Sequence, residues 1–125
     1  MIKFTTRLII CLTVLGLCAL YAFFQFIKPL NNVVYWTNAV KEEPSVKNFL
    51  TLIDALSEEG RFKEAEVCAL RGRGRYPNSE ALRLSYANIL LLQGRKAEAK
   101  VYLSELFNSK HPHIKDQAQQ KLRLL

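Results

Sequence analysis

Apolar residues are concentrated in one long run near the start of the chain. Residues 8–27 read LIICLTVLGLCALYAFFQFI, with 17 apolar residues and no charged residue. Twenty residues of helix rise about 30 Å, which is the thickness of a bilayer's hydrocarbon core. The pattern therefore predicts a transmembrane anchor over residues 8–27, preceded by a short flank over residues 1–7.

A cleaved secretory signal is the competing interpretation of this run. The apolar part of a signal is shorter, and small residues follow it at the cleavage site. Here the run continues through Phe23, Phe24 and Phe26, and no small-x-small site stands at its end. A lipoprotein signal ending at Cys18 would need a small residue before it, where Leu17 stands. We therefore expect an uncleaved anchor.

Beyond residue 44 the pattern changes to amphipathic helices separated by turns. Apolar residues recur at the i, i+3, i+4, i+7 spacing of one helix face. Phe49, Leu52, Ile53 and Leu56 have this spacing, and a second stripe on one helix face follows at i, i+4, i+7 and i+8, formed by Leu82, Tyr86, Ile89 and Leu90. Each stripe is followed by a glycine, Gly60 or Gly94, where the lack of a Cβ favours a helix-ending turn.

These stripes belong to an internal repeat. The segment Gly60-Arg61-Phe62-Lys63-Glu64-Ala65-Glu66 returns as Gly94-Arg95-Lys96-Ala97-Glu98-Ala99-Lys100. The two copies have a period of 34, which is that of the tetratricopeptide repeat, a helix–turn–helix unit. The small Ala65 and Ala99 stand where two helices of one hairpin must approach closely. The turn glycine, the packing alanine and a terminal proline agree together with the amphipathic pattern.

The chain resembles the tetratricopeptide repeat family over residues 45–112. The resemblance implies an all-α fold with one repeat over residues 45–78 and another over residues 79–112. The positions that define it are Phe49, Gly60, Ala65, Pro77, Tyr86, Gly94, Ala99 and Pro112. Residues 113–125 have one apolar face and predict a capping helix, which repeat arrays need at their ends.

Residues 28–44 form either a linker or a degenerate half-repeat helix between the anchor and the array. Val33, Val34 and Val40 are the residues we expect to supply its packing face. Tyr35 and Trp36 are either aromatic anchors at the level of the lipid headgroups or core residues. Because two repeats are fewer than arrays usually need, we expect the domain to be only marginally stable alone.

In this family the first helices of the repeats line a groove that binds peptides. The resemblance implies a groove lined by Lys47, Leu50, Asp54, Ala81, Leu84, Asn88 and Leu91. Some relatives bind a carboxylate there through a lysine and asparagines, but only Asn88 matches that pattern. The alternative interpretation is that these residues simply pack against neighbouring helices.

The chain is basic, with 18 Lys+Arg against 11 Asp+Glu and a net charge of +7. Arg71, Arg73 and Arg75 form a basic patch at the expected end of a helix, where cations complement the helix dipole. An acidic protein partner or lipid headgroups suit this charge. We expect no nucleic acid, since no aromatic stacking platform accompanies the arginines.

Catalytic or metal-binding motifs are missing from the sequence. Three cysteines, Cys11, Cys18 and Cys68, form no CxxC pair, and two of them lie in the apolar run. His111 and His113 flank Pro112 without further ligands nearby. About 80 residues, 45–125, remain for the folded domain, too few to enclose a cleft easily. We therefore expect no enzyme activity, no cofactor, no metal and no small-molecule substrate.

The expected function is a non-catalytic, membrane-anchored scaffold for protein–protein interaction. Lys3 and Arg7 precede the anchor, so the positive-inside rule favours a cytoplasmic N-terminus. The domain would then lie in the periplasm, on the outer side of an inner membrane. Such a protein suits an accessory or assembly subunit of an envelope complex of the secretion, pilus or cytochrome-maturation type. The alternative is a chaperone-like periplasmic factor that binds exported polypeptides.

Overall fold

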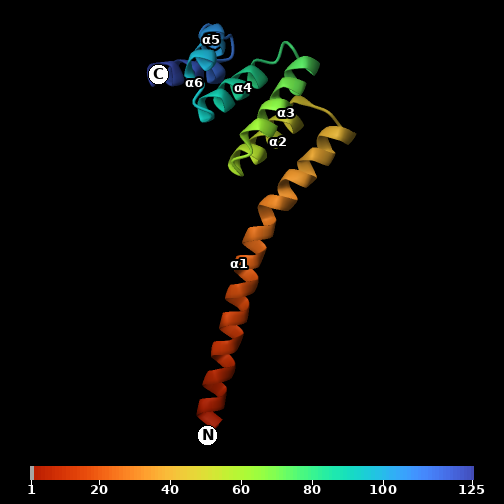
Figure 1. The fold of residues 1–125 in the computed structure, drawn as a ribbon, viewed down its shortest axis with the longest axis vertical. Coiled ribbons are helices and arrows are strands. Elements are labelled where there is room, and N and C mark those ends of the chain that lie inside the picture. The colour runs from red at the N-terminus through yellow and green to blue at the C-terminus, as the bar shows by residue number, and fades with distance from the viewer. Residues whose placement is uncertain (1) are drawn as a thin grey trace.

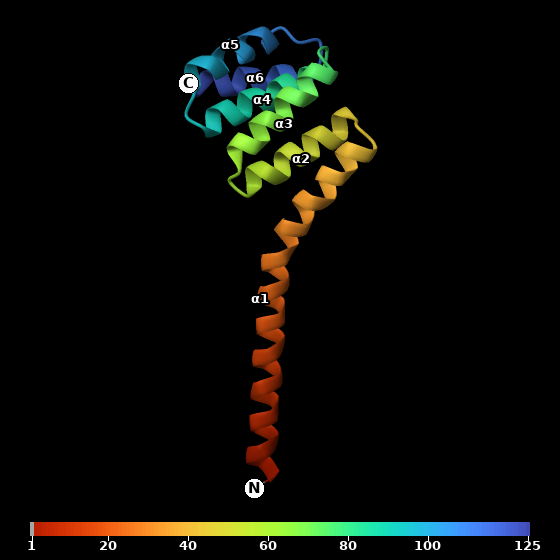
Figure 2. The ribbon, with the colours of Figure 1, turned by 45° about the vertical axis from the view of Figure 1, so that its right-hand side comes forward.

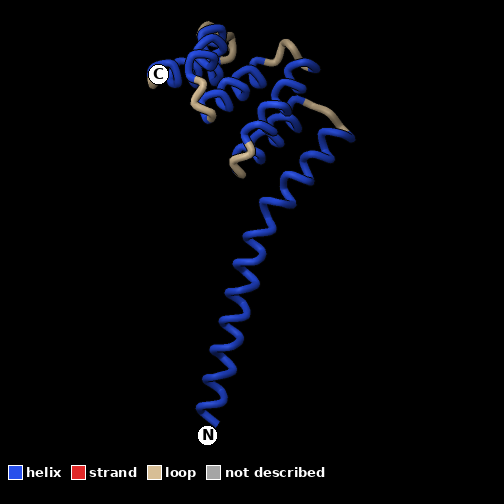
Figure 3. The backbone as a smooth tube through the Cα atoms, viewed as in Figure 1, coloured by secondary structure: helices blue, strands red, loops and turns tan. Residues whose placement is uncertain are grey.

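The structure is a computed structural model that describes residues 2–125, without the side chains of residues 28–31. Six helices, and no strand, are present in the described residues. They are α1 (Ile2–Glu42), α2 (Val46–Glu58), α3 (Phe62–Arg75), α4 (Glu80–Leu92), α5 (Lys96–Leu106) and α6 (Pro112–Arg123). Short loops join them (Figure 3), so the protein is all-helical, as expected.

Helix α1 is much longer than the other helices and extends away from them (Figure 1). Its 41 residues rise about 62 Å. It contains the apolar run and is long and apolar enough to cross a membrane. Side chains from Ile2 to Phe26 are all exposed, because no other part of the fold covers them.

The boundary expected after residue 27 does not end a helix, because α1 continues through it. It separates the exposed apolar part of α1 from the part that packs on other helices. The part of α1 beside α2 lies at an angle to the long part that extends away from the other helices (Figure 2).

The end of α1 packs against α2 and forms part of the core. Val33 is 6% exposed and belongs to the core cluster, and Trp36 and Val40 pack against that cluster. Val34, by contrast, is 58% exposed, so its expected place on the packing face is wrong. Successive residues of a helix lie about 100° apart around its axis, so Val34 points away from the face that the other three share. Trp36 is thus a core residue, whereas Tyr35 remains exposed beside it.

Helices α2 and α3 form one antiparallel hairpin, and α4 and α5 form a second with equivalent local geometry. Gly60 and Gly94 end the first helix of each with φ of 74° and 77°, a region that favours glycine. The residue after each glycine, Arg61 or Arg95, donates its N–H to a carbonyl in the last turn of that helix. The hydroxyls of two serines, at residues 45 and 79, cap α2 and α4 in the same way. Each of these equivalent pairs is separated by one period of the repeat.

Small residues allow close packing inside the hairpins. Ala65 and Ala99 are fully buried, at 0% exposure. Gly72 is also buried, and a Cβ on it would lie 3.2 Å from side-chain atoms of both Phe49 and Leu82. Gly72 therefore sets how closely α3 approaches the neighbouring helices α2 and α4.

Helix α6 closes the array at its far end. It begins at Pro112, whose fixed φ suits the first turn, rather than at residue 113 as expected. Ala118 of α6 is fully buried against a second core cluster that also contains Leu84, Leu103 and Leu106. The helices that follow α1 form a bundle beside its upper end (Figure 2), in which α2 also contacts α4 and α4 also contacts α6.

Candidate interaction surfaces

The residues predicted to line a groove on α2 and α4 have different environments. On α2, Lys47 and Asp54 are exposed and Leu50 is half-buried against the core. Partial burial, together with the neighbouring Glu58 carboxylate, raises the pKa of Asp54. These three residues leave a mixed surface of one cation, one anion and one apolar side chain.

On α4 two of the four predicted groove residues pack in the core cluster that includes the closing helix. Leu84 is only 6% exposed and packs in the cluster with α5 and α6, so it is a core residue rather than an open groove residue. Leu91 is half-buried and packs against both core clusters. Ala81 and Asn88 are half-buried, and the buried Asn88 Oδ1 has no hydrogen-bond partner among the described residues. The α4 half of the predicted groove is therefore mostly occupied by the fold itself.

The three arginines near the end of α3 do not form a single patch. Arg71 and Arg75 are exposed, but Arg73 is half-buried. Its guanidinium carbon lies 4.9 Å from the ring centroid of Tyr86 and 4.8 Å from that of Tyr102. The two rings pack edge to face, 5.1 Å apart. Arg73 therefore joins α3 to α4 and α5 by cation–π contacts, which sequence reasoning missed.

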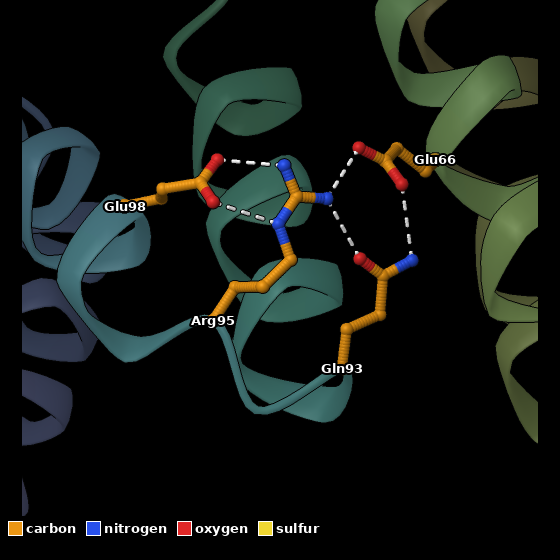
Figure 4. Close-up of polar contacts among 4 residues, drawn as sticks. All are labelled: Glu66, Gln93, Arg95 and Glu98. Carbon is orange, nitrogen blue, oxygen red and sulfur yellow. Dashed lines mark hydrogen bonds and ion pairs between the residues drawn. The ribbon is translucent and has the colours of Figure 1, made fainter.

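A polar network makes a second connection between the two hairpins (Figure 4). Arg95 Nη1 donates to Glu66 Oε1 of α3 at 2.7 Å, and its Nε and Nη2 donate to the Glu98 carboxylate at 2.9 and 2.6 Å. Gln93 Nε2 donates to the other Glu66 oxygen at 3.0 Å. The hydrogen bond from Arg95, then that from Gln93, lowers the pKa of Glu66. The Gly-Arg-x-x-Glu part of the repeat therefore builds a clamp on the preceding hairpin.

The same motif in the first hairpin lacks such a partner on the preceding helix. Arg61 pairs with Glu64 at 2.6 Å and with Glu59 at 3.2 Å, both within its own hairpin. The other Glu59 oxygen, Oε1, is buried without a hydrogen-bond partner in the described residues. Helix α1 thus packs on α2 through apolar side chains and is not clamped to the following turn.

A cavity of about 480 Å³ lies between α1, α2 and α3. Its apolar lining is formed by Val33, Val40, Phe49, Leu52, Leu56, Val67 and Cys68. Its remaining lining includes the cations Lys41, Lys63 and Arg71, all exposed. No sequence motif predicted this cavity. Aligning the end of α1 with the end of α3 by the period of the repeat would have indicated it.

No group of three or more His, Cys, Asp or Glu side chains is gathered among residues 2–125. Burial raises the pKa of the Cys68 thiol to about 11, so the reactive thiolate is scarce at neutral pH. In comparisons with protein-family models, curated proteins and solved structures, nothing matched the chain.

Proposed function

We propose that this protein is a non-catalytic, membrane-anchored module that binds another protein through an array of helical hairpins. The hairpins resemble tetratricopeptide repeats in their period, their turn glycines and their packing alanines. One observation carries the proposal. The helix that is apolar enough to span a membrane is also the first helix of the array, because its end packs on α2 through Val33 and Trp36.

This shared helix has a functional consequence. An array on a long flexible tether would sample many positions, whereas this one begins within a few residues of the apolar run. A module held close to the bilayer meets other membrane proteins at a high effective concentration. An accessory or assembly subunit of an envelope complex fits that role best.

The proposed orientation places the N-terminus in the cytoplasm and the array outside, because Lys3 and Arg7 precede the span. Protease added to intact spheroplasts of a bacterial host should then digest the array. A blot against a tag after Leu125 would measure this. Complete protection until the cells are lysed would reverse the orientation.

Purification in mild detergent tests the binding role. The full chain should retain a protein in fixed stoichiometry. A control with the same span fused to an unrelated soluble domain should lose it. Many weakly crosslinked polypeptides, with none in fixed stoichiometry, would favour the chaperone-like alternative. If the full chain and the control retain the same proteins, the array is not a binding module.

A further inference from the structure

The cavity between α1, α2 and α3 has a counterpart in the second hairpin, between α3, α4 and α5. We call these the first cleft and the second cleft. In each, the two outer helices flank a central one, and the outer pair makes no direct backbone contact in the described part of the chain. The difference between the clefts lies in the side chains that the sequence places there.

The helix ends align the two clefts residue by residue. Helices α2 and α4 begin one full period of the repeat apart, and so do helices α3 and α5. Helices α1 and α3 end at Glu42 and Arg75. The distance between these two ends is one residue shorter than the period of the repeat. Four residues of the second cleft, Glu66, Arg73, Tyr86 and Tyr102, therefore correspond to Val33, Val40, Leu52 and Cys68 of the first.

In the second cleft the corresponding side chains contact one another or a neighbouring helix. Arg73 lies against the rings of Tyr86 and Tyr102, and Glu66 receives hydrogen bonds from Arg95 and Gln93. In the first cleft all four corresponding residues are smaller or apolar, and all four line the cavity of about 480 Å³. The first cleft is thus an apolar hollow at the place where the repeat otherwise supplies an arginine and two tyrosines.

Cations surround this hollow. Lys41, Lys63 and Arg71 are exposed at its rim, and none of them makes an ion pair in the described residues. The one acidic residue in the lining, Glu64, is held by Arg61. An occupant with an apolar face bordered by carboxylates would match both the floor and the rim.

The position of the cleft on α1 favours a helix of another membrane protein. Val33 stands six residues beyond Ile27, the end of the apolar run, which is about 9 Å along a helix. A helix leaving the bilayer beside α1 would therefore enter the cleft directly. A lipid tail would have to leave the hydrocarbon core, which is unfavourable for every CH₂ group that it withdraws. A second copy of this chain, with its net charge of +7, would bring cations to a cationic rim.

We propose that the first cleft binds a juxtamembrane amphipathic helix of a membrane protein partner, with apolar residues spaced i, i+3, i+4, i+7 and acidic residues on both sides. This proposal rests on the proposed binding role and names the surface and the chemistry of the partner. The apolar face would fill the hollow that Arg73 and the tyrosines fill in the second cleft. The carboxylates would pair with Lys41, Lys63 and Arg71.

The test uses the full chain in nanodiscs of zwitterionic lipid and a synthetic helical peptide. The peptide carries leucines at the stated spacing and glutamates on the flanking positions, and a twin carries lysines in place of the glutamates. Anisotropy of the labelled peptide measures binding. In a C11S/C18S variant, Cys68 is the one remaining thiol, and its alkylation rate at pH 9 reports access to the cleft floor. The acidic peptide should bind and slow this alkylation, and the basic twin should do neither.

Three double variants locate the binding. K63E/R71E reverses two rim charges and should weaken binding of the acidic peptide by about tenfold or more. K96E/K100E makes the same change in charge on exposed residues of α5, outside the cleft, and should leave binding nearly unchanged.

L52Y/C68Y transfers the two tyrosines of the second cleft to the first cleft and should abolish binding. Fluorescence of Trp36, the only tryptophan, would show that α1 remains packed on α2.

Several results would overturn the proposal. These are equal binding of both peptides, no binding of either, or equal weakening by the two charge reversals. Slowed alkylation of Cys68 on adding anionic lipid alone would assign the cleft to lipid. Slowed alkylation with rising protein concentration would assign it to a second copy. If K63E/R71E still retains a stoichiometric protein in detergent, the binding role stands and this surface is wrong.

Discussion

Two arginines show how single residues join the hairpins. Arg73 and Arg95 belong to different parts of the chain, yet each connects the first hairpin to the second through its side chain. Arg73 uses the faces of two tyrosines, and Arg95 uses a carboxylate of the preceding hairpin and one of its own. Both side chains are partly buried, so their contacts are less screened by water than those of surface pairs.

Replacing Arg73 tests the cation–π contact. Arg73→Met keeps an unbranched side chain and helix propensity but removes the charge, so the free energy of unfolding should fall by about 1 kcal/mol. The matched control is Arg75→Met, in the same last turn of α3 but exposed. Urea unfolding of the full chain in detergent, followed by near-ultraviolet circular dichroism of the tyrosines, measures both. Equal losses would assign the effect to helix-end charge instead.

Glu66 gives the stability of the array a defined pH dependence. Its pKa is lowered from 4.5 in the folded state by hydrogen bonds from Arg95 and Gln93. The folded state therefore binds the proton less readily than the unfolded state. The stabilisation is fully present above pH 4.5 and is lost as the pH falls through the lowered pKa. Glu66→Gln should cost about 1 kcal/mol at pH 7 and progressively less in acid.

The control for this prediction is Glu105→Gln, an exposed residue of α5. This substitution removes the same negative charge, but the Glu105 carboxylate has no hydrogen-bond partner among the described residues. The urea midpoints of the wild type and Glu66→Gln, measured from pH 7 down to pH 3, should differ near pH 7 and converge at the acidic end. A constant difference across that range would mean that the lost stability comes from packing of the introduced glutamine and not from the charge of Glu66.

At the scale of elements, the hairpins depend on two alanines that admit no larger side chain. Ala65 and Ala99 are both 0% exposed. Ala65→Leu or Ala99→Leu should overpack its hairpin and lower the free energy of unfolding by about 1–3 kcal/mol. Ala97→Leu, on an exposed position of α5, should change it by less than about 0.5 kcal/mol. Thermal melts followed by far-ultraviolet circular dichroism would compare them. Unchanged melting of both core variants would contradict the close packing.

The sequence predicted the hairpins better than it predicted α1. Hairpin ends are set by local chemistry that recurs, such as the glycine turns and the serine caps, so one copy supports the other. In α1 the change in composition suggested a boundary after residue 27, but the helix continues through it to Glu42. A shift of one residue along α1 changes which side chain faces α2. In the structure Trp36, and not Val34, packs against the core.

The surfaces were harder to predict than the elements, for a physical reason. The expected groove residues were inferred from position within a repeat, whereas burial depends on what packs against that repeat. Leu84 is covered because α6 follows, and Arg73 is partly buried because tyrosines stand on two later helices. The first cleft is hollow because Val33, Leu52 and Cys68, on three different helices, are all smaller than their counterparts in the second cleft. None of these relations is local in sequence.

At the scale of the whole molecule, α1 serves as the first helix of the array as well as the apolar helix. The core residues Phe49 and Ile53 of α2 are 6% and 1% exposed. Val33 belongs to their cluster, and Trp36 and Val40 of α1 pack against it. Without α1, this side of α2 would have no covering helix. The array should therefore depend on residues 28–44, which continue the same helix as the predicted anchor.

Two soluble fragments test that dependence. The fragment 45–125 lacks the covering segment, and the fragment 30–125 retains it without the apolar run. Burial of side chains as large as Val33 contributes about 1.5–3 kcal/mol each, so the longer fragment should be more stable by about 3 kcal/mol or more. That is a large fraction of the roughly 5–15 kcal/mol typical of a domain. The shorter fragment should also self-associate, because Phe49 and its neighbours become exposed. Circular dichroism melts and sedimentation velocity would measure both effects.

Adjacent valines give this last prediction a control within the longer fragment. Val33 is 6% exposed and Val34 is 58% exposed, although they are neighbours on one helix with the same side chain. Val33→Ser should lower the melting temperature toward that of 45–125, because it places a hydroxyl in the apolar contact with α2. Val34→Ser should leave the melting temperature nearly unchanged. If 45–125 remains a monomer and melts as high as 30–125, or if the two serine variants melt alike, α1 is only an anchor. The first cleft would then lose one of its walls.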